Sequence, residues 1–279
     1  MPVETRFRSY WDSLAQSYSL AGPPLLPSPE DLLTVERAVA EWSITHPRRR
    51  LEALMLGVTP GVARLRWPEG ASLIAVDHAE AMTHAVWPRD LARGRSAVCA
   101  DWRALPCRNR SCDIVTGDGS VNCVRYPEGC FALLSSISDL LREDGLFILR
   151  TYIQPECKET PDEVFAAIDG EPGLTFPQFK FRLLMSVQHS AEEGAVLDRV
   201  YEAWAQRARN ASRLAARTGW DEGAIRTIEF YRDSETVHTF PTLPELECAV
   251  RPWFEQVSIS YPTYYLGERC PTLLLKPRR

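Results

Sequence analysis

The sequence contains no long apolar run, no signal-peptide pattern and no repeat. No stretch of its 279 residues approaches the roughly 20 apolar residues that a transmembrane helix needs. The first residues, Met1 to Arg6, lack the apolar segment of a signal peptide. Internal repeats and low-complexity tracts are also absent from the sequence. These absences predict a globular cytoplasmic protein with no membrane partner.

The cysteines show no metal-binding or redox pattern. None belongs to a Cys-x-x-Cys pair, and none has a histidine at the spacing of a zinc ligand. We therefore predict no metal and no redox dithiol, and reduced thiols suit a cytoplasmic chain. The eight cysteines are at positions 99, 107, 112, 123, 130, 157, 248 and 270.

Positive charge does not predominate, because 37 acidic residues outnumber 32 Lys and Arg and give a formal net charge of -5. Proteins that bind nucleic acid usually gather Lys and Arg into a basic surface. The one short basic run, Arg48 to Arg50, precedes a predicted strand and is more simply a solvated loop. A nucleic-acid partner is therefore not expected, and the oligomeric state is left open.

What the sequence does contain is an alternation of strands and helices. With 45% hydrophobic and 25% charged residues, the chain can bury a large core. Strands are predicted at 51–56, 72–76, 96–99, 112–116 and 146–152, with helices at 62–66, 79–87 and 131–141. This order predicts an α/β fold with a doubly wound, mainly parallel sheet over residues 51–155.

Other elements are predicted on both sides of this core. Residues 1–50 form a helical cap, with a helix over 6–20 and another that begins at Ser28 or Pro29 and ends near 44. Residues 243–279 add a helix over 243–254 and a hairpin of 256–261 with 272–275, which completes seven strands. The first helix carries an aromatic stripe of Phe7, Tyr10, Trp11, Leu14 and Tyr18.

The segment 156–242 is predicted to be a helical insertion after the fifth strand. Helices are expected at 161–168, 179–189 and 195–217, followed by a strand over 224–231. An insertion at this point would stand over the carboxyl edge of the sheet, where it could enclose a small-molecule acceptor. Packing against the sheet, or a dimer interface, is the structural alternative.

Glycine and acidic residues stand at the predicted ends of the first four strands. Ligands of doubly wound sheets bind at these carboxyl ends. Gly57 permits a tight turn beside a ligand. Asp77, twenty positions later, is at the distance of a ribose-diol acceptor. The four ends read Gly57-Val58-Thr59-Pro60-Gly61, Asp77-His78, Asp101-Trp102 and Gly117-Asp118-Gly119.

The third end suits a purine. Asp101 can accept a hydrogen bond from an exocyclic adenine amine, and Trp102 offers a flat apolar face. Each of these residues has a simpler structural role when taken singly, such as a turn glycine or a helix N-cap. Their order along the chain favours a nucleoside site.

This order resembles the class I S-adenosylmethionine-dependent methyltransferases over roughly residues 10–152 and the final hairpin. The resemblance implies a Rossmann-like methyltransferase fold, S-adenosyl-L-methionine as cofactor and methylation of a small molecule. Two positions depart from the family pattern, since Met55 replaces a common acidic residue and Thr59 a common glycine. The implied cofactor-binding residues are Tyr10, Tyr18, Gly57, Val58, Thr59, Asp77, His78, Met82, Asp101, Trp102, Gly117, Asp118 and Gly119.

The sequence assigns no catalytic residue. His189 and His238 lie in the carboxyl half, where a general base could stand, although a lone histidine is more often structural. A nicotinamide-dependent oxidoreductase is a rival, but the loop that begins at Gly57 lacks the second and third glycines of Gly-x-Gly-x-x-Gly. A catalytically silent cofactor-binding module is the other alternative, because Met55 and Thr59 alter the first motif.

Overall fold

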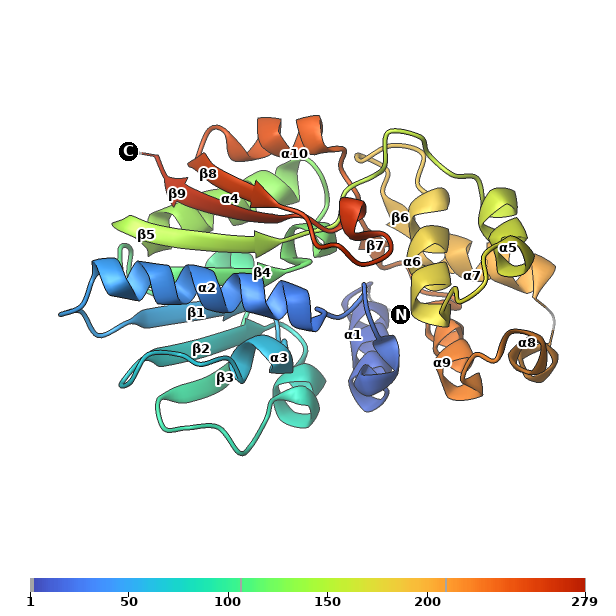
Figure 1. Ribbon diagram of the computed structural model, residues 1–279, viewed down its shortest axis with the longest axis horizontal. Helices are drawn as coiled ribbons and strands as arrows, with labels where there is room; N and C mark the ends of the chain where they lie inside the picture. The colour runs from blue at the N-terminus through green and yellow to red at the C-terminus, as the bar shows by residue number, and fades with distance from the viewer. Residues whose placement is uncertain (1–2, 106, 209, 279) are drawn as a thin grey trace.

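A seven-stranded sheet forms the centre of the molecule (Figure 1). The computed structural model describes residues 3–105, 107–208 and 210–278, with side chains from residue 10 onward. The strand order is β3-β2-β1-β4-β5-β9-β8. The pairs β5–β9 and β9–β8 are antiparallel, and the other neighbouring pairs are parallel. The predicted doubly wound, mainly parallel sheet is confirmed. Its strands are β1 (Glu52–Leu56), β2 (Ser72–Asp77), β3 (Arg95–Cys99), β4 (Cys112–Asp118), β5 (Leu141–Arg150), β8 (Phe254–Ser260) and β9 (Thr272–Pro277).

Helices cover both faces of this sheet. Successive strand residues point to opposite faces, so apolar side chains on both faces pack against helices. Ala53 and Met55 of β1 pack in one apolar cluster with α2 (Pro29–Thr45) and α3 (Pro60–Ala63). Leu54 and Leu56 pack in another cluster with α4 (Glu128–Leu140) and α10 (Leu243–Val250). Short helical turns complete the loops: η2 (Met82–Val86), η3 (Trp102–Ala104), η4 (Ser120–Cys123) and η6 (Gly267–Arg269).

Two helices, α1 (Val3–Gln16) and α2, form the amino-terminal part of the chain. The helix α2 begins at Pro29, as the sequence predicts, and Ser28 and Asp31 form a capping box at its start. The first helix is shorter than predicted, since α1 is followed by a separate turn, η1 (Tyr18–Ala21). Phe7 of the predicted stripe lies outside the described side chains.

Residues 156–242, called the cap below, pack around aromatic side chains. The rings of Phe176 and Phe179 lie 6.0 Å apart by centroid, and each lies within 6.0 Å of the rings of Trp204 and Trp220. In Figure 1 the cap stands beside the carboxyl ends of the strands, with α1 adjoining it. Its elements are α5 (Pro161–Gly170), α6 (Phe176–Ser186), β6 (Ala195–Val196), α7 (Leu197–Arg207), α8 (Ala211–Thr218), α9 (Glu222–Arg226), η5 (Thr227–Tyr231) and β7 (Val237–His238).

Two predictions for the cap are wrong. The segment 224–231 is helical rather than a strand, because its buried residues Ala224, Ile228 and Tyr231 recur at helical spacing. The single helix over 195–217 is instead a short strand and two helices, with Asn210 as the N-cap of α8. Asn210 begins a second helix within this stretch, and the apolar periodicity alone did not reveal the break between the two helices.

No helix among the described residues is long and apolar enough to cross a membrane.

A buried ionic cluster joins the sheet to the segments around its carboxyl edge. Arg150, at the end of β5, is 2% exposed and pairs with Asp31 at 3.2 Å and Asp118 at 2.6 Å. Its guanidinium also donates to the carbonyl of Pro24 at 2.7 Å, and the Tyr264 hydroxyl donates to Asp31 at 3.0 Å. Residues from four other places in the chain therefore contact this one cation.

We expect Arg150→Met to lower the free energy of unfolding by about 3–5 kcal/mol, because two buried carboxylates would lose their cation. Urea titration at neutral pH measures this loss. Arg110→Met is the control, since Arg110 pairs with Glu143 on the surface and should change stability by less than about 1 kcal/mol. Equal effects of the two substitutions would contradict the assigned role.

Candidate functional site

Two glycines shape the sheet edge at the point where the strand order reverses, between β1 and β4. Gly57 has a φ of +82° and donates its N–H to the carbonyl of Val76 at 2.7 Å. Gly119 has a φ of +64°, and a Cβ there would lie 2.9 Å from Cε2 of Tyr152. Both positions therefore require glycine, and both loops open at the carboxyl ends of the strands.

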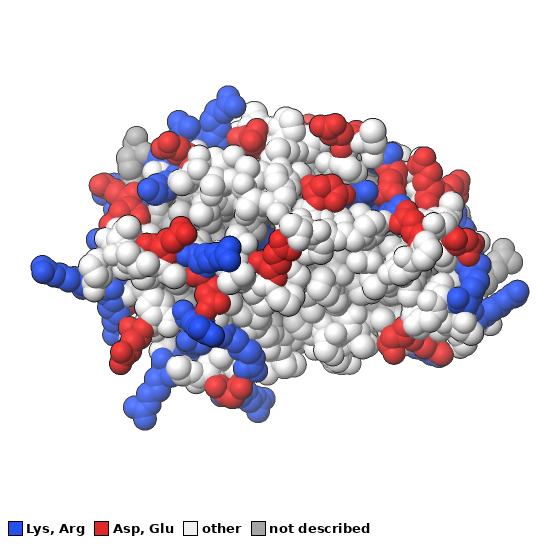
Figure 2. Space-filling view, in the orientation of Figure 1, with Lys and Arg blue, Asp and Glu red and all other residues white. Residues whose placement is uncertain are grey.

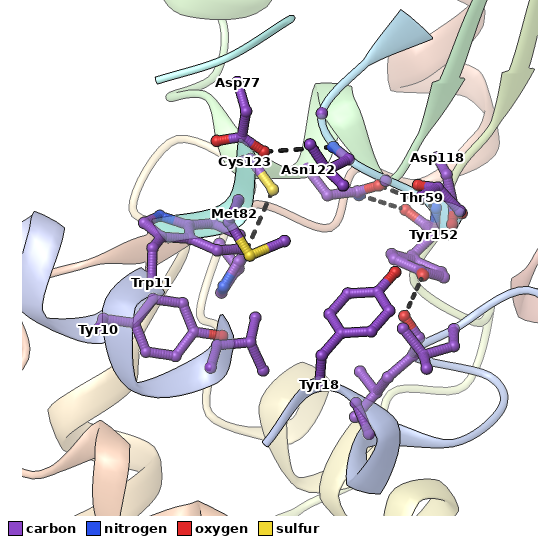
Figure 3. A pocket seen from close by; sticks show the side chains of 18 of the residues that line it. Tyr10, Trp11, Tyr18, Thr59, Asp77, Met82, Asp118, Asn122, Cys123 and Tyr152 are labelled. Carbon is purple, nitrogen blue, oxygen red and sulfur yellow. Dashed lines mark hydrogen bonds between the residues drawn. The ribbon is translucent and has the colours of Figure 1, made fainter. Parts of the chain in front are cut away.

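A cavity of about 140 Å³ lies over this edge. One water needs only ~10–15 Å³ by the same measure, so the space suits a larger ligand. Figure 3 shows Tyr10, Tyr18 and Met82 facing this space, with Asp77 and Asp118 at its strand-end side. Ten predicted cofactor residues line the cavity together: Tyr10, Tyr18, Gly57, Val58, Thr59, Asp77, Met82, Trp102, Asp118 and Gly119.

The other three predicted residues lie outside its lining. Asp101 is exposed and accepts hydrogen bonds from Arg103 at 2.6 and 3.0 Å, which lowers the pKa of its carboxyl group. His78 stands beside the site, with its Nδ1 3.8 Å from a carboxylate oxygen of Asp77. Gly117 lies below the floor, where a Cβ would collide with the Ser120 hydroxyl.

Asp77 presents a buried carboxylate to the cavity. Its side chain accepts backbone N–H bonds from Ala79 at 2.9 Å and from Val58 at 3.2 Å, one on each oxygen. The residue is only 5% exposed, and burial raises the pKa of its carboxyl group to about 6. Each oxygen keeps a lone pair beyond these bonds, so the carboxylate can also accept from a ligand diol.

Trp102 is held beside Asp77. Its indole N–H donates to the carbonyl of Val76 at 2.5 Å, and its ring lies 3.5 Å from the position that a Cβ on Gly57 would take. The side chain is therefore fixed at the carboxyl end of β2 and contributes its ring to the cavity wall.

The two departures from the first motif have structural explanations. Met55 is 1% exposed and packs in the core below the sheet edge. Thr59 lines the cavity, as Tyr18 does. Burial raises the pKa of Tyr18, and the nearby carboxylate of Asp118 raises it further. Thr59 thus adds a side chain to the cavity wall where a glycine would add none.

The cap supplies the far wall of the cavity. His238 is the histidine placed there, whereas His189 is exposed and lies outside the lining. Burial lowers the pKa of His238 to about 4, so its ring is neutral at physiological pH. The cap residues in the lining are Lys180, Leu184, Tyr231, His238 and Phe240.

Asn122 is a lining residue that the sequence analysis missed. Its amide nitrogen donates to the carbonyls of Tyr152 and Thr239 at 2.8 and 2.7 Å. Its amide oxygen accepts from the Thr151 hydroxyl and the Tyr152 N–H at 2.9 and 3.0 Å. The residue thus joins β4, the end of β5 and the end of the cap. Its place three residues after Gly119 was the available signal.

Comparison with known proteins supports the resemblance seen in the sequence. No protein-family model matches the chain. The malonyl-[acyl-carrier protein] O-methyltransferase of Laribacter hongkongensis (strain HLHK9) is 28% identical over 184 residues. This match covers 60% of our chain and 57% of the relative, so the chain spans little more than half of the relative's length.

Solved structures share the fold at low identity. The 1,6-didemethyltoxoflavin-N1-methyltransferase of Burkholderia thailandensis, solved with bound 1,6-didemethyltoxoflavin and S-adenosylhomocysteine, has a TM-score of 0.53 and 15% identity. The alignment covers 99% of our chain and 89% of that protein. A Rhodobacter sphaeroides structure, provisionally named for Zn-dependent alcohol dehydrogenases, has a TM-score of 0.55 and 12% identity, covering 96% and 98%.

The sequence relative and the fold together confirm the resemblance to class I S-adenosylmethionine-dependent methyltransferases. Structures with this fold are named as a methyltransferase and as an alcohol dehydrogenase, so the fold alone does not identify the reaction. The reaction must be inferred from the residues around the cavity.

We expect Asn122→Ala to lower the free energy of unfolding by about 2–4 kcal/mol, because four buried partner groups would lose a hydrogen bond. Chemical denaturation measures the change. Asn109→Ala, on the exposed loop before β4, is the matched control and should stay within about 0.5 kcal/mol of the parent. A parent-like Asn122→Ala protein would show that this bridge is dispensable.

Proposed function

We propose that this chain, which has the fold of class I S-adenosylmethionine-dependent methyltransferases, transfers a methyl group from S-adenosylmethionine to a small molecule. The observation that carries the proposal is the convergence of the strand-end residues on one cavity. Gly57, Asp77, Trp102 and Gly119 come from four different loops and line the same space. A ligand that contacts all four must lie across the switch point of the sheet.

The strand-end wall fits a nucleoside. Asp77 offers carboxylate lone pairs to a ribose diol, and Trp102 offers an aromatic face to the adenine. Gly57 keeps the wall between them free of a side chain. Asp101, bound to Arg103, would have to turn inward to reach an adenine amine. We therefore assign the adenine chiefly to Trp102.

The methionine end of the cofactor is assigned to Asp118 and Tyr18. Asp118 and Asp77 are the carboxylates among the described lining residues. One oxygen of Asp118 is held by Arg150 at 2.6 Å, which orients the group at the end of β4. Asp118 can therefore accept from a ligand ammonium group, a role for which Met55 has no suitable atom.

The chain's own contribution to methyl transfer is alignment and exclusion of water. When bound, S-adenosylmethionine supplies a methyl group already activated on a sulfonium sulfur. Tyr10, Trp11 and Phe240 give the cavity aromatic walls, and the cap closes it opposite the sheet. Such walls hold the acceptor in line and keep competing water away. His238, neutral at physiological pH, can accept a hydrogen bond from an acceptor hydroxyl.

A small acceptor fits the surroundings better than nucleic acid. Five cap side chains line the cavity, so the acceptor would be enclosed rather than laid across a surface. On the face drawn in Figure 2, acidic and basic side chains of the described residues are interspersed, with no continuous basic track. The relative from Laribacter hongkongensis is named as an O-methyltransferase, which makes oxygen one acceptor atom to test.

Two alternative functions can be distinguished from methyl transfer by testing ligand binding and turnover. An oxidoreductase would bind NAD, but the first loop lacks the glycines that a dinucleotide pyrophosphate needs. A silent module would bind S-adenosylmethionine without turnover, and methyl transfer against a metabolite panel tests it.

We expect Asp77→Ala to weaken S-adenosylhomocysteine binding by about 1.5–3 kcal/mol, through loss of charge-assisted hydrogen bonds to the ribose. Calorimetric titration measures the affinity, and Asp77→Asn tests the charge with little change in size. Asp90→Ala, an exposed substitution outside the cavity, should bind like the parent. Unchanged affinity in a folded Asp77→Ala protein would remove Asp77 from the site.

The raised pKa of Asp77 gives the same assignment a pH test. Ribose hydroxyls donate to the carboxylate, so binding favours its ionised form. Below pH 6 the ligand must first displace a proton, and affinity should fall as the pH is lowered from 7.5 to 5. The part of the pH dependence that Asp77→Ala removes is the part assigned to Asp77.

We expect Trp102→Ala to weaken S-adenosylhomocysteine binding by about 1 kcal/mol, because the purine loses its stacking surface. Trp102→Phe should retain most of the affinity. Asp101→Ala tests the predicted bond to the adenine amine in the same titration. If neither Trp102→Ala nor Asp101→Ala changes the affinity, the adenine lies elsewhere.

A further inference from the structure

Four basic side chains of the described chain are deeply buried, and one of them differs from the rest. Arg150, Arg182 and Arg269 are 2%, 5% and 8% exposed, and each pairs with at least one carboxylate. Lys180 is 3% exposed and forms no ion pair with any carboxylate of the described residues. A buried charge without a counter-ion is costly, so its retention calls for a physical reason.

The surroundings of Lys180 leave its charge uncompensated. Its Nζ donates to the hydroxyl of Thr227 at 2.8 Å, which satisfies one of its three N–H bonds. It also lies 5.4 Å from the ring centroid of Tyr231 and 6.0 Å from that of Phe176. Ring faces attract a cation but do not neutralise it. Burial lowers the pKa of Lys180 only to about 8, so the group stays mostly protonated at neutral pH.

The two carboxylates of the cavity are already engaged elsewhere. Asp77 is held by the backbone of Val58 and Ala79 at the sheet edge, and Asp118 is paired with Arg150. Lys180 lines the cavity from α6, on the cap side. A mobile anion is therefore the group that can complete the charge balance around it.

We propose that Lys180 binds a carboxylate group of the methyl acceptor, which makes the substrate of this enzyme a small organic acid. This inference rests on the proposed methyltransferase function, which puts a sulfonium cation and the Lys180 ammonium in one water-poor cavity. Two cations in such a space repel each other. An anionic acceptor between them removes that repulsion and is itself oriented by a charge-assisted hydrogen bond.

The residues of the cap-side cavity wall favour an acceptor with a single negative charge. Lys180 is the only cationic side chain among the described residues that line the cavity, and most of the remaining cap-side lining is aromatic or aliphatic. A phosphate dianion would need more donors than this wall offers. A carboxylate joined to an apolar body satisfies both the ammonium and the rings.

The experiment that tests this proposal compares the binding of a carboxylic acid with that of its neutral amide. Calorimetry with S-adenosylhomocysteine-loaded protein uses hexanoate against hexanamide, and benzoate against benzamide. We expect the parent to bind at least one carboxylate roughly tenfold more tightly than its amide, and Lys180→Met to lose that preference. Lys158→Met, which removes an exposed lysine outside the cavity, should keep it.

Stability separates ligand binding from a structural role. Replacing an unpaired buried charge by Met should leave the melting temperature equal or higher, whereas a lysine needed for packing would give a lower one. Lys180→Gln provides a polar variant should Lys180→Met fail to fold. Both variants should bind S-adenosylhomocysteine within about twofold of the parent, because Lys180 faces the acceptor.

Three results would overturn the assignment: no carboxylate binds the parent, the parent binds amides as well as acids, or the Lys180 variants keep the preference. Failure of the proposed function has a different signature. In that case the parent would not bind S-adenosylhomocysteine, while the same acid and amide titrations on the cofactor-free protein would still report on Lys180.

Discussion

The pairing of Arg150 with Asp31 and Asp118 is the constraint on which the cavity floor depends. The three charges are buried where water cannot replace a lost partner, so displacing one leaves another uncompensated. The same guanidinium holds the loop before α2 through the carbonyl of Pro24, and contacts the hydroxyl of Tyr152 at 2.9 Å. The end of β4, the end of β5 and the amino-terminal segment are thereby fixed relative to each other.

A second ionic cluster fixes the cap. Glu159 accepts hydrogen bonds from Arg182 of α6 and from Arg269 before β9, the latter at 2.7 Å. The helix that carries Lys180 is therefore held to the carboxyl-terminal segment by Arg182, two positions along the same helix. Buried arginines stabilise the scaffold on both sides of the cavity, and the buried lysine between them is left for a ligand.

Much of the core could be predicted from the sequence because its signals are local. Asp77 and Gly57 follow apolar runs, and a parallel sheet brings such strand ends to one edge. The cap was harder to predict, since Ala224 and Ile228 are apolar in both a helix and a strand. The β6–β7 pair depends on contacts between Ala195 and His238 that no local pattern encodes.

The site itself divides in the same way. The strand-end wall was predicted, whereas Lys180 lies in α6, a helix buried along most of its length, and is distinguished only by burial without an ionic partner. Asp101 has a suitable local pattern but turns to Arg103, because a neighbour two positions away satisfies its charge. The local sequence pattern predicts which residues could contact a ligand. The tertiary structure determines which of their side chains are available to do so.

The most direct measurement is a crystal structure of the protein with S-adenosylhomocysteine. We expect the ribose hydroxyls to donate to the Asp77 carboxylate, the adenine to lie against Trp102, and the sulfur to face the cap wall that carries His238 and Lys180. A nucleoside bound outside this cavity, or one whose ribose lies away from Asp77, would contradict the assignment of the strand ends as the cofactor site.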